Sequence, residues 1–246
     1  MSIDKTPAVV LKTFDFRETS RIATFFTKEF GKVKGLLKGI RKDPKKFGSP
    51  LNLGSLNEIV FYRKRSSDLH LISHCDLQKD FAQIRKDLKR AVTLNYILEL
   101  ADALTPVEDK NKLLFELLVS ALVSLEAETD TPKLLHIFQI KTLALSGFKP
   151  HFDSCLICDK KIAATAFFSH KLGGLLCLNC RSRDLDSRAV LKGTIATIKH
   201  IEQEEWEGAL RLGLNSTVRL ELSEILQDFL HFHVERRMKS AELLGL

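Results

Sequence analysis

The spacing of apolar residues changes once along this chain, near residue 80, and this change constrains the fold more than any other feature. Residues 1–80 contain short runs rich in β-branched and aromatic side chains, separated by glycine, proline and serine, which is typical of strands joined by turns. From Phe81 onward the apolar residues recur three and four positions apart, as on one face of an α-helix. The sequence therefore predicts an α+β protein with a strand-rich first part and a helical second part.

The first part is predicted to contain five short strands, at residues 8–16, 21–29, 32–42, 57–65 and 68–77. Glycines interrupt the third of these runs, as happens where a strand bends sharply or another segment approaches closely. Five short strands in this length fit a small closed barrel of the OB type. An SH3-like barrel would leave much the same pattern, so we predict an OB fold for residues 1–80 with that alternative open.

Residues 81–246 are predicted to form an all-α helical domain. Its helices are expected at residues 81–104, 105–126, 131–147, 188–206 and 216–238. The second and third begin at Thr105-Pro106 and Thr131-Pro132, where threonine can cap the helix and proline suits its first turn. A segment at 150–183 interrupts the helices, and we expect it to pack on the helical body.

The interrupting segment holds two Cys-x-x-Cys pairs separated by eighteen residues. This spacing is typical of a zinc ribbon, in which each pair supplies two sulfurs to one metal ion. The predicted ligands are Cys155, Cys158, Cys177 and Cys180, and they leave no coordination position open for water or substrate. We therefore predict one structural Zn²⁺ here. A pair of redox-active dithiols is the alternative, but it would favour a thioredoxin-like βαβ context that the sequence lacks.

Two residues near these motifs are assigned no chemistry. His170 lies inside the ribbon but exceeds the four ligands that zinc needs, so it is predicted to be a surface histidine. Cys75 stands alone in a predicted strand and is expected to be an inert core residue.

The net charge of +7 lies entirely in the first part of the chain. Residues 1–80 carry sixteen Lys or Arg against nine Asp or Glu, whereas residues 81–246 carry 22 of each sign. The excess peaks at residues 28–46, with eight basic residues against two acidic ones. Such an asymmetry indicates a polyanionic partner for the predicted barrel, although a solvated surface is the plainer alternative.

Nucleic acid is the polyanion that best suits a basic OB barrel. The residues predicted to contact its phosphates are Arg17, Arg21, Lys32, Lys34, Lys38, Arg41, Lys42, Lys45, Lys46, Arg63, Lys64 and Arg65. Most aromatic residues in this part are expected to pack in the barrel. Since neighbouring strand residues point to opposite faces, one member of Phe25-Phe26 and one of Phe61-Tyr62 is expected to face outward, where it can stack on a base.

Several classes of protein are excluded or disfavoured. The sequence has no phosphate-binding loop, no Gly-x-Ser-x-Gly elbow and no His-Glu-x-x-His motif, so we predict neither an enzyme nor a nucleotide cofactor. The N-terminus has no signal-peptide pattern, and no apolar run is long enough to span a bilayer. We therefore expect a cytoplasmic protein without membrane contact, associated with the nucleoid when it binds DNA.

Several short motifs, in order along the chain, resemble the RecO family of bacterial recombination mediators. In the first part they are Glu18-Thr-Ser-Arg21, Phe26-Thr-Lys-Glu-Phe-Gly-Lys32 and Lys38-Gly-Ile-Arg-Lys42. Later come Gly147-x-x-Pro150, the two cysteine pairs with Phe168-Ser169 and Gly173-Gly174 between them, and His233 followed by Met238-Lys-Ser240. One departure is Asp159, where the family often has glycine after the second cysteine.

The resemblance covers essentially the whole chain, and it implies an OB fold, a helical middle and a zinc-stabilised insertion. It also implies binding of single- and double-stranded DNA, annealing of complementary strands, and work with the single-strand-binding protein SSB and with RecR to help load RecA. Two rival functions remain open at this point: an RNA- or ribosome-associated protein with an OB fold and zinc ribbon, and a thiol oxidoreductase.

Overall fold

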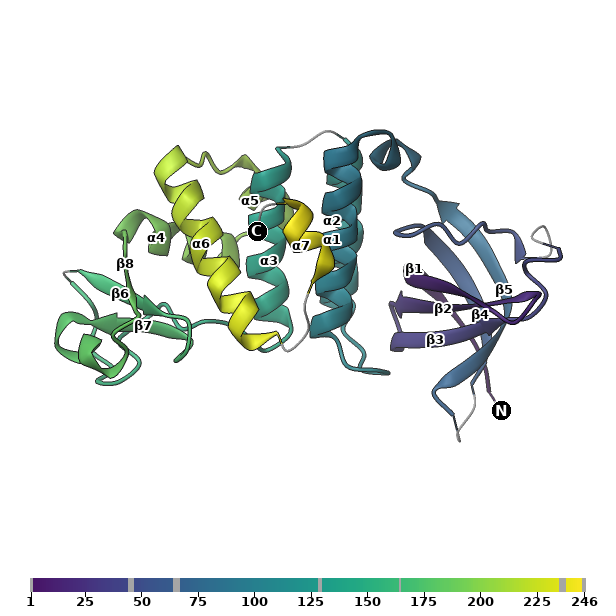
Figure 1. Ribbon diagram of the computed structural model, residues 1–246, viewed down its shortest axis with the longest axis horizontal. Coiled ribbons are helices and arrows are strands. Elements are labelled where there is room, and N and C mark those ends of the chain that lie inside the picture. Colours follow the sequence, from purple (N-terminus) through teal and green to yellow (C-terminus); the bar gives the residue numbers. More distant parts are fainter. Residues whose placement is uncertain are drawn as a thin grey trace. The chain divides into compact units, whose positions relative to one another are not determined.

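The computed structural model describes residues 2–43, 47–63, 67–127, 130–163, 165–234 and 238–244. These residues form two compact units, Met1–Thr129 and Asp130–Leu246 (Figure 1). The elements of the first unit are β1 (Ser2–Phe16), β2 (Ser20–Thr27), β3 (Gly31–Leu37), β4 (Leu56–Arg63), β5 (Leu69–Lys79), the 3-10 helix η2 (Ala82–Lys86), α1 (Leu88–Leu104) and α2 (Lys112–Glu126).

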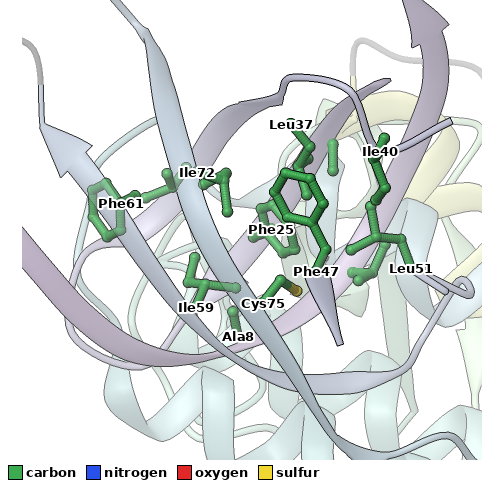
Figure 2. Close-up of a cluster of buried hydrophobic side chains, with 13 residues drawn as sticks. Ala8, Phe25, Leu37, Ile40, Phe47, Leu51, Ile59, Phe61, Ile72 and Cys75 are labelled. Atoms are coloured by element: carbon green, nitrogen blue, oxygen red, sulfur yellow. The ribbon is translucent and has the colours of Figure 1, made fainter. Parts of the chain in front are cut away.

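The five strands of the first unit close into a barrel in the order β1-β2-β3-β5-β4. All neighbouring pairs are antiparallel except β3 and β5, which run parallel. A five-stranded barrel with this order is an OB fold, so the predicted fold class is confirmed and the SH3-like alternative is dropped. Figure 2 shows the barrel interior, which is filled by apolar side chains such as Phe25, Phe61 and Ile72.

Alternation along the strands separates the interior from the outer face. On β3, Val33 and Leu37 point into the core, while Lys32 and Lys34 lie at positions of the opposite parity. Gly35 has the inward parity but no side chain, because an added Cβ would come within 2.3 Å of the Ile72 side chain. The glycine predicted to mark a close approach therefore makes room for a core residue of β5.

Helix α2 begins later than predicted. Thr105 ends α1 instead of capping the next helix, and Asn111 is the capping residue, since its side chain accepts a hydrogen bond from the backbone N–H of Leu114 at 3.0 Å. The intervening residues pair with the barrel instead: Glu108 donates its backbone N–H to the carbonyl oxygen of Lys32 at 3.0 Å. Contacts with the barrel override the local capping pattern.

The second unit combines helices with a small sheet. Its elements are α3 (Thr131–Leu145), β6 (Ala166–Ser169), β7 (Gly174–Cys177), the 3-10 helix η3 (Leu178–Arg183), β8 (Arg188–Val190), α4 (Lys192–Gln203), α5 (Trp206–Arg211), α6 (Ser216–His233) and α7 (Lys239–Leu244). Helix α3 packs against α4, α5 and α6. The residues 188–190, predicted as helix, form a strand because they pair with β6.

The sheet β7-β6-β8 packs on α6, as expected for the interrupting segment. Phe168 of β6 contacts Phe229 of α6 with 6.2 Å between ring centroids. The ring nitrogen Nε2 of His233 lies 2.7 Å from the carbonyl oxygen of His170, and Arg188 of β8 pairs with Asp228 at 3.2 Å. The ribbon is thus an integral part of the second unit.

The compact units divide the chain differently from the predicted limits at 80 and 81, because η2, α1 and α2 belong with the barrel. Helix α1 contacts β1, and α2 contacts η2. The domain limits 1–80 and 81–246, with the ribbon at 150–183, therefore stay a prediction.

Candidate nucleic-acid interface and metal centre

Two turns meet at one end of the barrel and bring basic residues together. The β1–β2 turn holds Arg17, and the turn after β3 holds Arg41. The backbone N–H of Arg41 donates to the carbonyl oxygen of Thr19 at 3.0 Å, and its guanidinium donates to the carbonyl oxygen of Arg17 at 3.1 Å. These bonds fix the two turns against each other. We name the resulting cluster the basic rim, made of Arg17, Arg21, Lys38, Arg41 and Lys42.

The charge of the basic rim is only partly neutralised. Asp15 lies 3.1 Å from the Nε of Arg21 and 3.4 Å from that of Arg41, so one carboxylate serves two guanidinium groups. Glu18 and Asp43 lie in the same two turns and are exposed, which leaves five cations against three carboxylates. Lys38, Arg41 and Lys42 are exposed, with their charges accessible to a ligand.

Lys34 extends this positive region along the barrel. It lies on the outer face of β3, exposed to solvent, three residues before the strand ends. Lys38 follows at the same parity in the turn beyond. The structure therefore brings six of the twelve predicted phosphate contacts, the basic rim and Lys34, to one end and one face of the barrel.

Lys32 does not belong to this surface, and its predicted role in DNA binding is corrected. Lys32 is 9% exposed. Its ammonium lies 3.2 Å from Oδ1 of Asp102 and 2.7 Å from the backbone carbonyl oxygen of Asp102. Lys12 also pairs with Asp102. Alternation placed Lys32 correctly on the outer face, but α1 covers that part of the face and supplies the buried carboxylate.

Arg63 lies at the other end of the barrel. Strand β4 ends there beside the β2–β3 turn, and the Arg63 guanidinium sits 5.6 Å from the ring centroid of Phe30. Glu108 accepts from Arg63 at 2.9 Å and lies 2.8 Å from His70. These two partners, Arg63 first, lower the pKa of Glu108. Arg63 is therefore paired with Glu108 and lies apart from the basic rim.

Four of the predicted phosphate contacts fall outside the described residues: Lys45, Lys46, Lys64 and Arg65.

The aromatic pairs are arranged partly as predicted. Phe25 and Phe61 point into the core, and Phe26 points outward, but Phe26 is fully buried because Phe115 of α2 lies 6.2 Å away. The expectation that Phe26 would be accessible is therefore wrong. Tyr62 is half-buried on the outer face.

The four predicted metal ligands converge in the second unit. The Sγ atoms of Cys155, Cys158, Cys177 and Cys180 all lie within 4.8 Å of one another. The thiols of Cys158 and Cys177 are 3.8 Å apart, too far for a disulfide, and all four cysteines are free. A tetrahedron with Zn–S bonds of about 2.3 Å has edges of about 3.8 Å, so four thiols at this spacing fit a metal ion.

Local structure holds the ligands in place. Cys177 ends β7 and Cys180 lies in η3, while the first pair sits on a turn. Gly174 allows the close approach of the segment that leads into that turn, since a Cβ there would meet the carbonyl oxygen of His151 at 2.7 Å. Asp159, the departure from the family pattern, adopts φ +56°, and its carboxylate accepts from the Ser154 hydroxyl at 2.6 Å. Aspartate tolerates this left-handed conformation, so the turn is kept without glycine.

The thiols differ in how readily they ionise. Burial raises the pKa of Cys155. Hydrogen bonds from the backbone N–H groups of Cys158, Cys177 and Ile157 have a larger opposite effect, so the pKa falls to about 6. Desolvation and then the neighbouring thiols raise the pKa of Cys180 to about 12. Four thiols this close cannot all become thiolates without a cation among them, which is the role a metal ion takes in such clusters.

The two residues set aside from the sequence take no part in these sites. Cys75 is fully buried in the barrel core, and burial raises the pKa of its thiol to about 12, as expected for an inert residue. His170 lies outside the cysteine cluster; its ring is half-buried with its centroid 5.6 Å from that of Phe232.

Comparison with known proteins decides the family. A family model described as Recombination protein O N terminal matches residues 1–81, and one described as Recombination protein O C terminal matches residues 85–242. This chain belongs to the RecO family. The membership confirms the resemblance inferred from the short motifs.

Full-length relatives agree with the family models. The protein named DNA repair protein RecO from Pelotomaculum thermopropionicum is 32% identical over 247 residues, covering 99% of this chain and 94% of its own length. Those of the same name from Syntrophus aciditrophicus and Desulforamulus reducens are each 30% identical, covering 98% and 99% of this chain and 94% of their own lengths.

Among the described residues, no helix combines the length and apolar character needed to cross a bilayer.

The residue that sequence reasoning missed is Asp102. It lies inside a helical run whose apolar spacing gave no sign that a carboxylate would be buried against the barrel. Its only sequence signal is an acidic side chain between Ala101 and Ala103.

Proposed function

We propose that this RecO-family protein is a DNA-binding mediator of recombinational repair, without catalysis of its own. The observation that carries the proposal is the basic rim, where two hydrogen-bonded turns and the start of β2 gather five cations at one end of an OB barrel. The relatives named DNA repair protein RecO support DNA, rather than RNA, as the polyanion.

The mechanism follows from charge. Cations that neutralise backbone phosphates release condensed counterions, and the gain is independent of base sequence. A protein that holds two strands in this way raises the local concentration of complementary DNA and offsets the repulsion between their backbones. We propose that the protein binds single- and double-stranded DNA by this means and anneals complementary strands.

The proposed partners follow from the family. They are SSB, RecR and, indirectly, RecA, which the protein would help to load on DNA inside the cytoplasm. An annealing assay on complementary strands coated with SSB tests this part, and acceleration by the protein is the expected result. No acceleration of annealing, with DNA binding intact, would contradict the mediator role.

We further propose that the metal of the cysteine cluster is one structural Zn²⁺. The spacing of the four thiols supports it, and because all four protein ligands fill a tetrahedral shell, no position remains for a substrate. Elemental analysis is expected to find about one zinc per chain. Removal of the zinc by a chelator should unfold the ribbon and change the stability of the barrel little. A purified protein without metal, whose thiols oxidise reversibly, would instead favour the thiol oxidoreductase.

The basic rim is tested by reversing its most exposed charges. The triple variant Lys38→Glu, Arg41→Glu and Lys42→Glu is expected to lose nearly all affinity for a single strand, because attraction to phosphates becomes repulsion. Circular dichroism should match the unchanged protein, since these three residues are exposed. Thermal unfolding should show only a small loss of stability, because Arg41→Glu removes the contacts of its exposed guanidinium with the Arg17 carbonyl oxygen and Asp15. Fluorescence anisotropy with a labelled oligonucleotide measures the affinity.

A control triple variant has the same net charge. Lys86→Glu, Lys89→Glu and Lys161→Glu change exposed lysines outside the barrel. The control is expected to bind DNA within a few-fold of the unchanged protein at the same ionic strength. Equal binding by both triple variants would show that the rim is not the interface, and equal loss would show that only net charge matters.

A further inference from the structure

One continuous apolar row runs around the outside of the barrel, and it begins and ends on β1. Cross-strand register pairs Phe14 with Ile22, Ile22 with Leu36, Leu36 with Leu71, Leu71 with Tyr62 and Tyr62 with Ile3. Directly opposed residues share a face, and the neighbours of several members point into the core. We name these six residues the apolar stripe: Ile3, Phe14, Ile22, Leu36, Tyr62 and Leu71.

The apolar stripe is partly accessible to solvent. Ile3 is 64% exposed and Phe14 is 54% exposed, while Leu36, Tyr62 and Leu71 are half-buried. Ile22, between Phe14 and Leu36, is the one buried member of the stripe. The six adjoining apolar residues come from all five strands. Monomeric proteins rarely leave such a row within reach of water, and exposed apolar patches commonly mark binding sites.

Positive charge borders the stripe. On β3 the stripe residue Leu36 stands between Lys34 and Lys38, which share its outward parity. On β1, Phe14 is followed by Phe16 and then by Arg17, whose guanidinium lies 5.2 Å from the Phe16 ring centroid. A ligand that covers the stripe therefore meets cations at its edges, so it must combine apolar faces with negative charge.

We propose that the apolar stripe receives the bases of single-stranded nucleic acid, with Phe14 and Tyr62 as the stacking side chains and Lys34 and Lys38 on the neighbouring phosphates. This inference rests on the proposed DNA binding, and it adds a base contact that distinguishes a single strand from a duplex. A duplex keeps its base faces inside the stack, so only a single strand can use the aromatic rings. A protein partner with an acidic rim is the competing occupant.

Strands with and without bases provide the test. The affinity of the unchanged protein is measured for an oligothymidylate and for an abasic strand of equal length, at one salt concentration. Stacking of one base on an aromatic side chain corresponds to an affinity difference of about 5- to 150-fold. The unchanged protein is expected to bind the intact strand at least about 5-fold more tightly than the abasic strand.

Variants assign the preference to the stripe. Phe14→Ala should weaken binding of the intact strand by about 5-fold or more, leave the abasic strand unaffected, and so reduce the preference. Phe14→Tyr keeps a ring and should retain it. Phe148→Ala is the matched control, because Phe148 is 41% exposed in the second unit. Folding of each variant is checked by thermal unfolding.

The possible results separate the two proposals. If neither strand binds, the proposed DNA binding fails and the stripe has no such ligand. If both bind the unchanged protein equally, phosphate binding stands and the base contact is overturned. A preference that persists in Phe14→Ala and in Tyr62→Leu also overturns it, and leaves a protein as the occupant of the stripe.

Discussion

The outer face of the barrel has two halves that the sequence makes alike and the fold makes different. In the covered half, Lys32 and Phe26 lie under α1 and α2, paired with Asp102 and Phe115. In the bare half, Lys34 and Phe14 occupy equivalent outward positions and remain exposed. The same residue types therefore stabilise the fold in one half and are available to a ligand in the other.

The difference teaches that charge counting identifies a binding region but not its members. Strand alternation places Lys32 and Lys34 on one face, with only one residue between them. What separates their roles is a carboxylate seventy residues away in sequence, on α1. A lysine with a buried partner contributes to stability, whereas one without such a partner is available to phosphates.

The largest expected effect comes from removing an aromatic ring in the covered half. Phe26→Ala should lower the free energy of unfolding of the first unit by about 3–5 kcal/mol, since it leaves a cavity between the barrel and α2. Phe14→Ala should change it by less than about 1 kcal/mol, because its ring is mostly in water. Urea unfolding measures both. Similar losses for the two variants would remove the distinction between the halves.

The next effect comes from the buried carboxylate. Asp102→Asn keeps the shape but loses the charge facing Lys12 and Lys32, and should cost roughly 2–3 kcal/mol. The matched control is Glu116→Gln, which breaks the exposed pair with Lys28 and should cost less than about 1 kcal/mol. Stability of Asp102→Asn equal to that of the control would mean that this ion pair is not needed to hold α1 on the barrel.

A smaller effect concerns pH. Burial raises the pKa of Asp102, but Lys12 and Lys32 lower it more, so its folded-state pKa lies below the ordinary value of 3.8. The carboxylate therefore contributes stability that is fully present above pH 3.8 and is lost as pH falls through the lowered pKa. The unchanged protein should lose stability more steeply than Asp102→Asn in that acid range. Parallel pH dependences would contradict this assignment.

Much of the fold was predictable because its signals are local. The five strands, the helical second part and the cluster of four cysteines follow from alternation, helical spacing and Cys-x-x-Cys geometry, each contained in a short segment. Predictions failed where distant segments meet. Thr105-Pro106 has a good local start for a helix, yet the chain there pairs with β3 through Lys32 and Glu108 instead.

The candidate site shows the same limit. The positive region and its position on the barrel were predictable from charge, and Arg17, Arg21, Lys38, Arg41 and Lys42 do come together at the rim. The exclusion of Lys32 and the burial of Phe26 were not, because both depend on helices that follow the barrel in sequence. The apolar stripe was hidden for a related reason, since its register joins five strands whose spacing in sequence differs.

Salt dependence of binding tests the distinction between the halves most directly. For a single strand, each lost phosphate contact should reduce the slope of log affinity against log salt by about 0.7. Lys34→Ala is expected to show this reduction. Lys32→Met, which leaves Asp102 paired with Lys12, should keep the slope of the unchanged protein and lose stability instead. An unchanged slope in Lys34→Ala together with a reduced slope in Lys32→Met would contradict the account.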